Sequence, residues 1–177
     1  MIAERWPRCC TKPLMMVCLA SVAFAGTLTG KVVKIVDGDT IDVLDGSNAV
    51  HRVRLHGVDA PETGQPFAKR AREATGDFVH ERQVVVTTNE APDRYGRLVG
   101  RVTLGGRDVG LALLEAGWAW QFTRYDTSVL YRDAEQAARR GRRGLWADSK
   151  PVPRWEWRKM PKEEREKRRE TVPAARE

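Results

Sequence analysis

The stretch KIVDGDTIDVL, from Lys34 to Leu44, has two aspartates around one glycine, between two runs rich in β-branched residues. Asp-Gly between alternating apolar residues is a strong short-range signal for a β-hairpin. Asp37 and Gly38 therefore predict a turn that joins two antiparallel strands. The turn does not require the second aspartate, so Asp39 is a candidate for a carboxylate with a further task.

Other strands are expected after this hairpin. Apolar and β-branched runs predict strands over residues 28–36, 40–44, 50–58, 83–88 and 98–104. In the third strand, VHRVRLHGV, Val53 and Leu55 fall on one face, whereas Arg54 and His56 fall on the other. A sheet of this kind must curl or be covered, which favours a barrel.

About three helices are expected between and after the strands. Residues 66–80 carry an apolar stripe at helical spacing, and residues 108–117 form a short helix that Gly117 caps. Residues 128–140 form the last helix, with Ser128 at its N-cap. The pattern predicts an α+β fold, a five-stranded OB-type β-barrel with about three helices, of a kind that binds oligonucleotides.

The first 25 residues differ from the rest. Three basic residues and one acid precede the uncharged run PLMMVCLASVAFA, which ends at Ala25. A basic head, a short apolar middle and a small-x-small end are typical of a secretory signal peptide. We expect cleavage after Ala25 and a periplasmic or secreted protein; the alternative is that residues 1–25 remain attached as a membrane anchor.

The remaining chain is basic and free of cysteine. The formal net charge is +7, and loss of three basic residues and one acid with the leader leaves +5. This balance favours anionic partners, nucleic acid first, over the alternative of simple solubility. All three cysteines lie in the leader, so residues 26–150 are expected to form a domain without disulfides. Residues 151–177, first rich in Pro and Trp and then almost wholly charged, predict a packed exit and a solvated or disordered tail.

Five charged residues stand where the pattern of strands and helices does not require them: Asp39, Arg54, Asp59, Glu62 and Arg97. Each has an ordinary alternative role, as a turn former, a solvated strand residue or part of an exposed loop. An EF-hand is excluded because its sixth position requires glycine, and the three histidines lack ligand spacing. No Gly-rich phosphate loop is present.

Together these residues belong to four motifs: DGDT at 37–40, VRLHGVDAPET at 53–63, DRYGR at 93–97 and GLW at 144–146. In order, spacing and residue type the motifs resemble the thermonuclease (staphylococcal-nuclease-like) family, from about Gly30 to Trp146. The resemblance implies a Ca²⁺-dependent endonuclease that hydrolyses phosphodiester bonds of DNA and RNA with low sequence specificity.

The resemblance also implies roles for individual residues. Asp39 and Asp59 would be carboxylate ligands of Ca²⁺, and Ala60 would supply a backbone carbonyl. The best-known members have threonine at this last position, and a backbone ligand survives that change. Glu62 would act on the attacking water, and Arg54 and Arg97 would stabilise the charged transition state through bidentate hydrogen bonds.

Two further residues, Arg94 and Tyr125, resemble family positions near the bound nucleotide. Tyr125 would stack on a base, or else simply pack against the protein. The main alternative for the whole chain is a non-catalytic nucleic-acid-binding module on the same barrel. All five charged residues are present, which favours the enzyme, and we expect it to act as a monomer without stable membrane association once the leader is removed.

Overall fold

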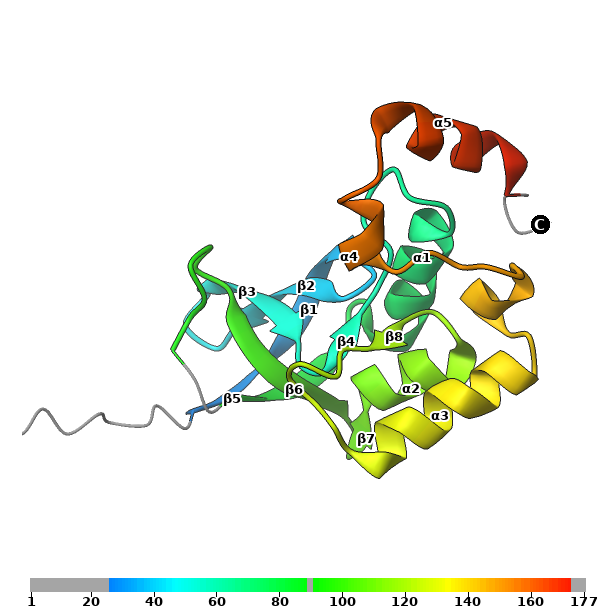
Figure 1. Ribbon diagram of the computed structural model, residues 1–177. Helices are drawn as coiled ribbons and strands as arrows, with labels where there is room; N and C mark the ends of the chain where they lie inside the picture. Colours follow the sequence, from blue (N-terminus) through cyan, green and yellow to red (C-terminus); the bar gives the residue numbers. More distant parts are fainter. Residues whose placement is uncertain (1–25, 89–90, 173–177) are drawn as a thin grey trace, which may run out of the picture.

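Five strands close into a barrel whose axis runs through the apolar core. The structure is a computed structural model that describes residues 26–88 and 91–172, so the expected leader lies outside the described residues (Figure 1). The barrel strands are β1 (Gly26–Asp37), β2 (Thr40–Asp45), β3 (Val50–Leu55), β5 (Gln83–Thr88) and β6 (Leu98–Leu104). Their order is β3-β2-β1-β5-β6, and a parallel pairing of β3 with β6 closes the barrel. The OB-type, α+β prediction is therefore confirmed.

Three short strands complete the β-structure. β7 (Arg107–Asp108) extends the sheet beside β6, whereas β4 (Val58–Asp59) and β8 (Trp120–Gln121) pair separately. The third predicted strand, residues 50–58, is thus two strands divided by a turn at His56–Gly57. Gly57 has a φ of 75°, a conformation that other residues rarely adopt, and this turn ends β3. The correction matters because the turn redirects the chain toward Asp59.

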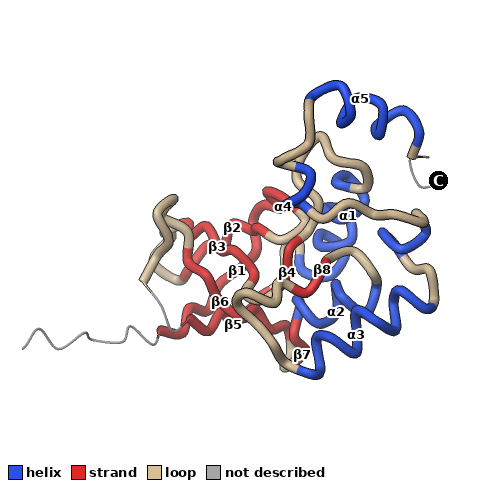
Figure 2. The backbone as a smooth tube through the Cα atoms, viewed as in Figure 1, coloured by secondary structure: helices blue, strands red, loops and turns tan. Residues whose placement is uncertain are grey.

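Helices cover one side of the barrel (Figures 1 and 2). They are α1 (Ala68–Val79), α2 (Val109–Ala116) and α3 (Val129–Arg140), followed by a short 3₁₀ helix at Gly144–Ala147. The side chains of Asp108 and Ser128 accept hydrogen bonds from the backbone N–H groups of Leu111 and Tyr131, which caps α2 and α3. Gly117 ends α2 as predicted. Among the described residues no helix is both long and apolar enough to cross a membrane.

The C-terminal segment is helical and solvated, rather than disordered, in the part that the structure describes. It forms α4 (Arg154–Trp157) and α5 (Lys162–Thr171), which together with α1–α3 make five α-helices in residues 26–88 and 91–172. Acidic residues in the first turn of α5 and basic residues in its last turn suit the helix dipole, although the helix buries no side chain. Trp157 of α4 is fully buried and Trp155 stacks on Phe122, so the predicted packing of the exit is confirmed.

The barrel interior is filled by β-branched residues from alternating strand positions. Val32, Ile41, Val43 and Val53 are fully buried, and Leu113 of α2 packs with them in one apolar cluster. Val53 and Leu55 face this core as predicted. The core therefore fixes which residues of β2 and β3 face inward, and hence the position of the turns at the strand ends.

The turn between β1 and β2 is packed directly against α1. A Cβ atom at Gly38 would lie 2.8 Å from the Cβ of Ala60 and 3.0 Å from the Cβ of Ala71. The Gly38 carbonyl accepts a hydrogen bond of 2.7 Å from the buried hydroxyl of Thr75. Glycine is thus required at position 38 because Ala60 and Ala71 leave no room for a Cβ atom there, in addition to its role in the turn.

We predict that Gly38→Ala lowers the free energy of unfolding by about 1–3 kcal/mol, because the new methyl group overpacks the contact with Ala60 and Ala71. Denaturant unfolding measures the change. Gly46→Ala is the matched control, since a Cβ at Gly46 meets no atom within 4 Å. Equal effects of the two substitutions would contradict the close-packing argument.

Candidate functional site

Asp39 and Asp59 share one buried counter-ion, the guanidinium of Arg54. Arg54 Nη1 lies 3.0 Å from Asp39 Oδ2, and Nη2 donates a 2.7 Å hydrogen bond to Asp59 Oδ1. The relative exposures of the three residues are 0%, 4% and 8%. Two carboxylates twenty positions apart in the sequence are therefore brought together inside the protein.

The pairing of β2 with β3 places this cluster. Thr40 lies opposite Arg54 in the antiparallel ladder, so Asp39 stands at the end of β2 next to the Arg54 side chain. Arg54 Nη1 also donates to the carbonyl oxygen of Val58 at 2.8 Å. The guanidinium thus holds the turn that leads the chain back to Asp59.

Both oxygens of Asp39 are held by short hydrogen bonds. The Thr40 hydroxyl donates to Oδ1 at 2.9 Å, and the backbone N–H of Ala60 donates to Oδ2 at 2.8 Å. The threonine of DGDT therefore orients the aspartate before it. Asp37, in contrast, accepts a hydrogen bond from Thr63 at the protein surface.

Glu62 lies at the rim of the same cluster, with 21% of its side chain exposed. Gln65 holds its loop: the Glu62 N–H donates to Gln65 Oε1 at 3.2 Å, and the Gln65 N–H donates to the Glu62 carbonyl at 2.8 Å. Glu62 Oε2 accepts hydrogen bonds from Arg154 at 3.2 Å and Arg158 at 2.8 Å. The structure therefore places a partly exposed carboxylate beside two buried ones.

Arg154 is the site residue that the sequence analysis missed. Its Nη1 lies 3.3 Å from Asp39 Oδ2 and 3.6 Å from Asp59 Oδ1, while its Nε donates to Glu62. The packing of the Pro- and Trp-rich exit was predictable, but nothing in the local pattern distinguishes Arg154 from the other arginines of a highly charged segment.

Burial affects the ionisation of the acid cluster. Burial raises the pKa of Asp59 to about 6; Arg54 opposes this rise, whereas the nearby charge of Asp39 adds to it. The raised pKa therefore reflects burial of the Asp59 carboxyl group first, and its nearness to Asp39 only in part. A further cation close to the two carboxylates would favour their charged forms.

We tested whether the residues fit a bound cation. In the part of the chain that the structure describes, no group of three or more Asp, Glu, His or Cys side chains is placed to hold a metal ion. The donor set nevertheless fits, because two buried carboxylates followed by the Ala60 carbonyl are the oxygen ligands that Ca²⁺ prefers. The Arg154 guanidinium already places positive charge against these oxygens.

Arg97 is brought near the cluster by barrel closure, although its side chain has another partner. Leu98, which follows Arg97, pairs with Val53, which precedes Arg54. The guanidinium of Arg97 donates two hydrogen bonds, of 2.7 and 2.9 Å, to Asp93 within the same loop. Although burial opposes the charged form, these bonds hold the pKa of Asp93 below its usual value.

The two residues predicted to bind the nucleotide are exposed. Arg94 donates a 2.7 Å hydrogen bond to the hydroxyl of its neighbour Tyr95. Tyr125 is 54% exposed and packs edge-on against Phe122, with ring centres 5.0 Å apart. These partners are other aromatic residues, so the roles of Arg94 and Tyr125 in nucleotide binding stay predictions.

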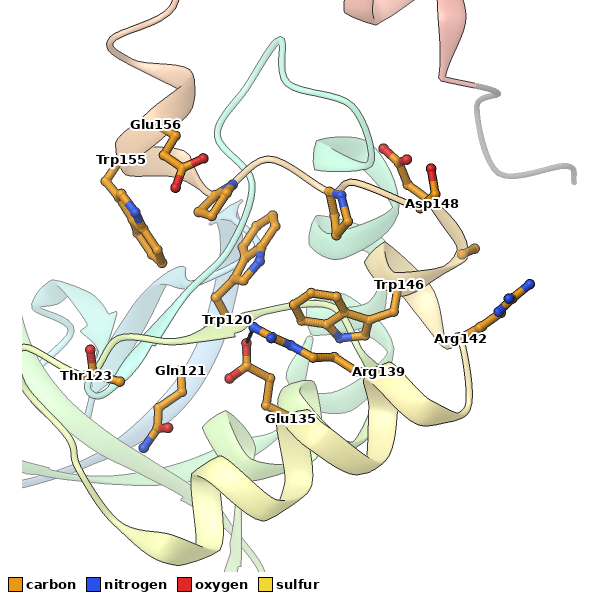
Figure 3. A pocket seen from close by; sticks show the side chains of 14 residues that line it. Trp120, Gln121, Thr123, Glu135, Arg139, Arg142, Trp146, Asp148, Trp155 and Glu156 are labelled. Carbon is orange, nitrogen blue, oxygen red and sulfur yellow. Dashed lines mark hydrogen bonds and ion pairs between the residues drawn. The ribbon is translucent and has the colours of Figure 1, made fainter.

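An open groove of about 810 Å³ is lined in part by Trp155 and Glu156 of α4 (Figure 3). Trp120, Trp146 and Trp155 line it, together with Arg139, which is paired with Glu135. Asp148 and Glu156 also line this groove, so its walls do not favour a phosphodiester. The chemistry is better assigned to the cluster around Arg54.

Comparison with known proteins agrees with this geometry. A family model described as "Staphylococcal nuclease homologue" matches residues 52–148, which include Arg54, Asp59, Glu62 and Arg97. Asp39 precedes the matched stretch and Arg154 follows it.

Named relatives cover most of the chain. It is 37% identical over 147 residues to "Uncharacterized endonuclease" of Escherichia coli O157:H7, which covers 82% of this chain and 95% of the relative. It is 39% identical over 158 residues to "Micrococcal nuclease" of Shigella flexneri, covering 83% and 90%, and 41% identical over 159 residues to "Protein ParB" of Escherichia coli, covering 82% and 87%. The barrel, the acid cluster and these matches together show that the chain belongs to the staphylococcal nuclease homologue family, and that it is a hydrolytic nuclease acting on nucleic acids.

Proposed function

We propose that the protein is an exported, Ca²⁺-dependent endonuclease that hydrolyses DNA and RNA with low sequence specificity. Water would attack phosphorus, the bond to the 5′ oxygen would break, and the products would carry a 3′-phosphate and a 5′-hydroxyl. The observation that carries the proposal is that Asp39 and Asp59 converge on Arg54 while Glu62 is linked to both acids through Arg154. This arrangement combines a cation-binding donor set with a carboxylate at the rim.

Each site residue is assigned a role that suits its chemistry. Asp39, Asp59 and the Ala60 carbonyl would hold the cation, which when bound would polarise the phosphodiester and offset its charge. Glu62 would take a proton from the attacking water or orient it. Arg54 and Arg97 would each donate paired hydrogen bonds to the oxygens that gain charge in the transition state, since arginine is never a practical proton donor.

We predict that the purified protein digests single-stranded DNA and RNA with Ca²⁺ but not with an excess of chelator, and that Glu62→Gln lowers kcat by at least about 10²-fold. Release of acid-soluble nucleotides measures both effects. Glu115→Gln is the control, because Glu115 is an exposed residue whose ion-pair partner is Arg107.

Undiminished activity in chelator, or in Glu62→Gln, would overturn this mechanism. Binding of DNA without turnover at saturating Ca²⁺ would instead support the non-catalytic alternative. Thermal unfolding measured with and without chelator shows whether the protein remains folded when it loses activity.

We expect Arg97→Met to lower kcat by about 10²-fold with a smaller change in KM, because its contribution is proposed to arise in the transition state. The loss of stability should be below about 1 kcal/mol, since the ion pair with Asp93 is partly exposed. Arg107→Met, the control, removes a more exposed ion pair, with Glu115, and should leave kcat unchanged. A pure rise in KM for Arg97→Met would place this residue in substrate binding.

Export is proposed from the leader sequence. Cleavage after Ala25 would start the mature chain at Gly26, which is also the first residue of β1. We expect N-terminal sequencing of the protein recovered from the producing cell to begin at Gly26, and Ala25→Arg to block processing. Recovery of an intact N-terminus would favour the anchored alternative.

A further inference from the structure

The feature that goes beyond the family site is the position of Arg154, on a helix that follows the matched family domain. The Arg154 side chain is only 14% exposed and contacts all three acids of the cluster. Its guanidinium lies 3.3 Å from Asp39, 3.6 Å from Asp59 and 3.2 Å from Glu62. The guanidinium of Arg154 therefore contacts the two carboxylates proposed to bind the cation and the one proposed to act on the attacking water.

The guanidinium and a metal ion require the same oxygen atoms. Arg154 Nη1 is directed at Asp39 Oδ2 and Asp59 Oδ1. A Ca²⁺ ion bound by these carboxylates would lie about 2.3–2.6 Å from its ligand oxygens. A positive guanidinium at its present distance from the same oxygens would then lie against the ion, where like charges repel in a poorly solvated site.

We propose that Arg154 is a residue of the nuclease site that occupies the place of the cation, so that a divalent cation binds only by displacing this guanidinium. This inference rests on the proposed function, because it concerns the regulation of the same carboxylates. Arg154 and Arg54 together place two positive charges against Asp39, Asp59 and Glu62, which offsets the cost of burying carboxylates close together.

The packing of α4 indicates that a cation would displace only the side chain of Arg154, while the helix itself stays in place. Trp155 stacks on Phe122 with ring centres 5.9 Å apart and an angle of 8°, and Trp157 is 1% exposed. Gln65 Nε2 donates a hydrogen bond to the Val152 carbonyl just before the helix. Figure 3 shows Trp155 and Glu156 at the groove, while the contacts of Arg154 are with the acids. The exchange therefore requires a change of Arg154 rotamers rather than release of the C-terminal segment.

The exchange also sets the apparent affinity for the cation. A cation that must displace a bound guanidinium gains only the difference between the two interactions, so its apparent affinity is lower than that of a site without a competitor. Replacing Arg154 by a neutral residue should increase cation affinity. A purely structural arginine would not have this effect, since its loss would disorder the carboxylates and weaken binding.

The test is calorimetric titration of the purified, metal-free protein with CaCl₂ in the absence of nucleic acid. We expect Arg154→Met to bind Ca²⁺ at least tenfold more tightly than the unchanged protein, and Arg154→Lys to fall between the two, because one ammonium group does not bridge three carboxylates as a guanidinium does. The matched control is Arg168→Met, which removes an arginine of the same C-terminal segment that pairs with Asp148 and should leave the affinity unchanged. Equal or weaker Ca²⁺ binding by Arg154→Met would overturn the proposal.

Thermal unfolding supplies a second readout if Arg154→Met folds poorly without metal. Ca²⁺ should raise the Tm of Arg154→Met and Arg154→Lys more than that of the unchanged protein, and equal shifts would contradict the exchange. Digestion assays separate the two proposals. Ca²⁺-dependent cleavage with unchanged affinity in Arg154→Met would refute the inference alone, whereas cleavage that persists in chelator would refute the proposed function and the inference with it.

Discussion

The structure depends on a buried group of like charges that one guanidinium holds together. Asp39 and Asp59 are almost completely removed from water, and separation from solvent makes both their ionisation and their mutual repulsion costly. Arg54 resolves this by bonding to both carboxylates and to the backbone of the turn that joins them in space. Removal of the guanidinium would therefore affect the local fold as well as the chemistry.

The barrel supplies the rigidity that this arrangement requires. The pairing of β2 with β3 sets Arg54 beside Asp39. The packing of Gly38 against Ala60 and Ala71 fixes the turn between β1 and β2. Closure of the barrel by β3 and β6 brings the loop of Arg97 to the same strand. The candidate site is thus assembled from strand ends and loops that one apolar core positions.

The C-terminal segment gives this member of the family a feature outside its matched domain. α4 is anchored by tryptophans and carries Arg154 into the acid cluster, whereas α5 is held by ion pairs and hydrogen bonds at the surface. Arg154 contacts Glu62 although it lies more than ninety residues after it in the sequence. In our proposal its guanidinium takes the place of a cation beside these carboxylates.

Local patterns in the sequence determined most of the barrel, whereas the acids were singled out by the resemblance of four motifs to a known family. Period-two strands, the Asp-Gly turn and the caps at Ser128 and Gly117 depend on residues near one another in the chain, so β5 and β6 begin and end as predicted. Only the tertiary structure shows that the guanidinium of Arg154 lies beside the two buried carboxylates. Arg154 and Asp39 are 115 positions apart, and an arginine in a charged segment has no local signal for its partner; only the docking of Trp155 and Trp157 on the folded domain brings its guanidinium to the acids.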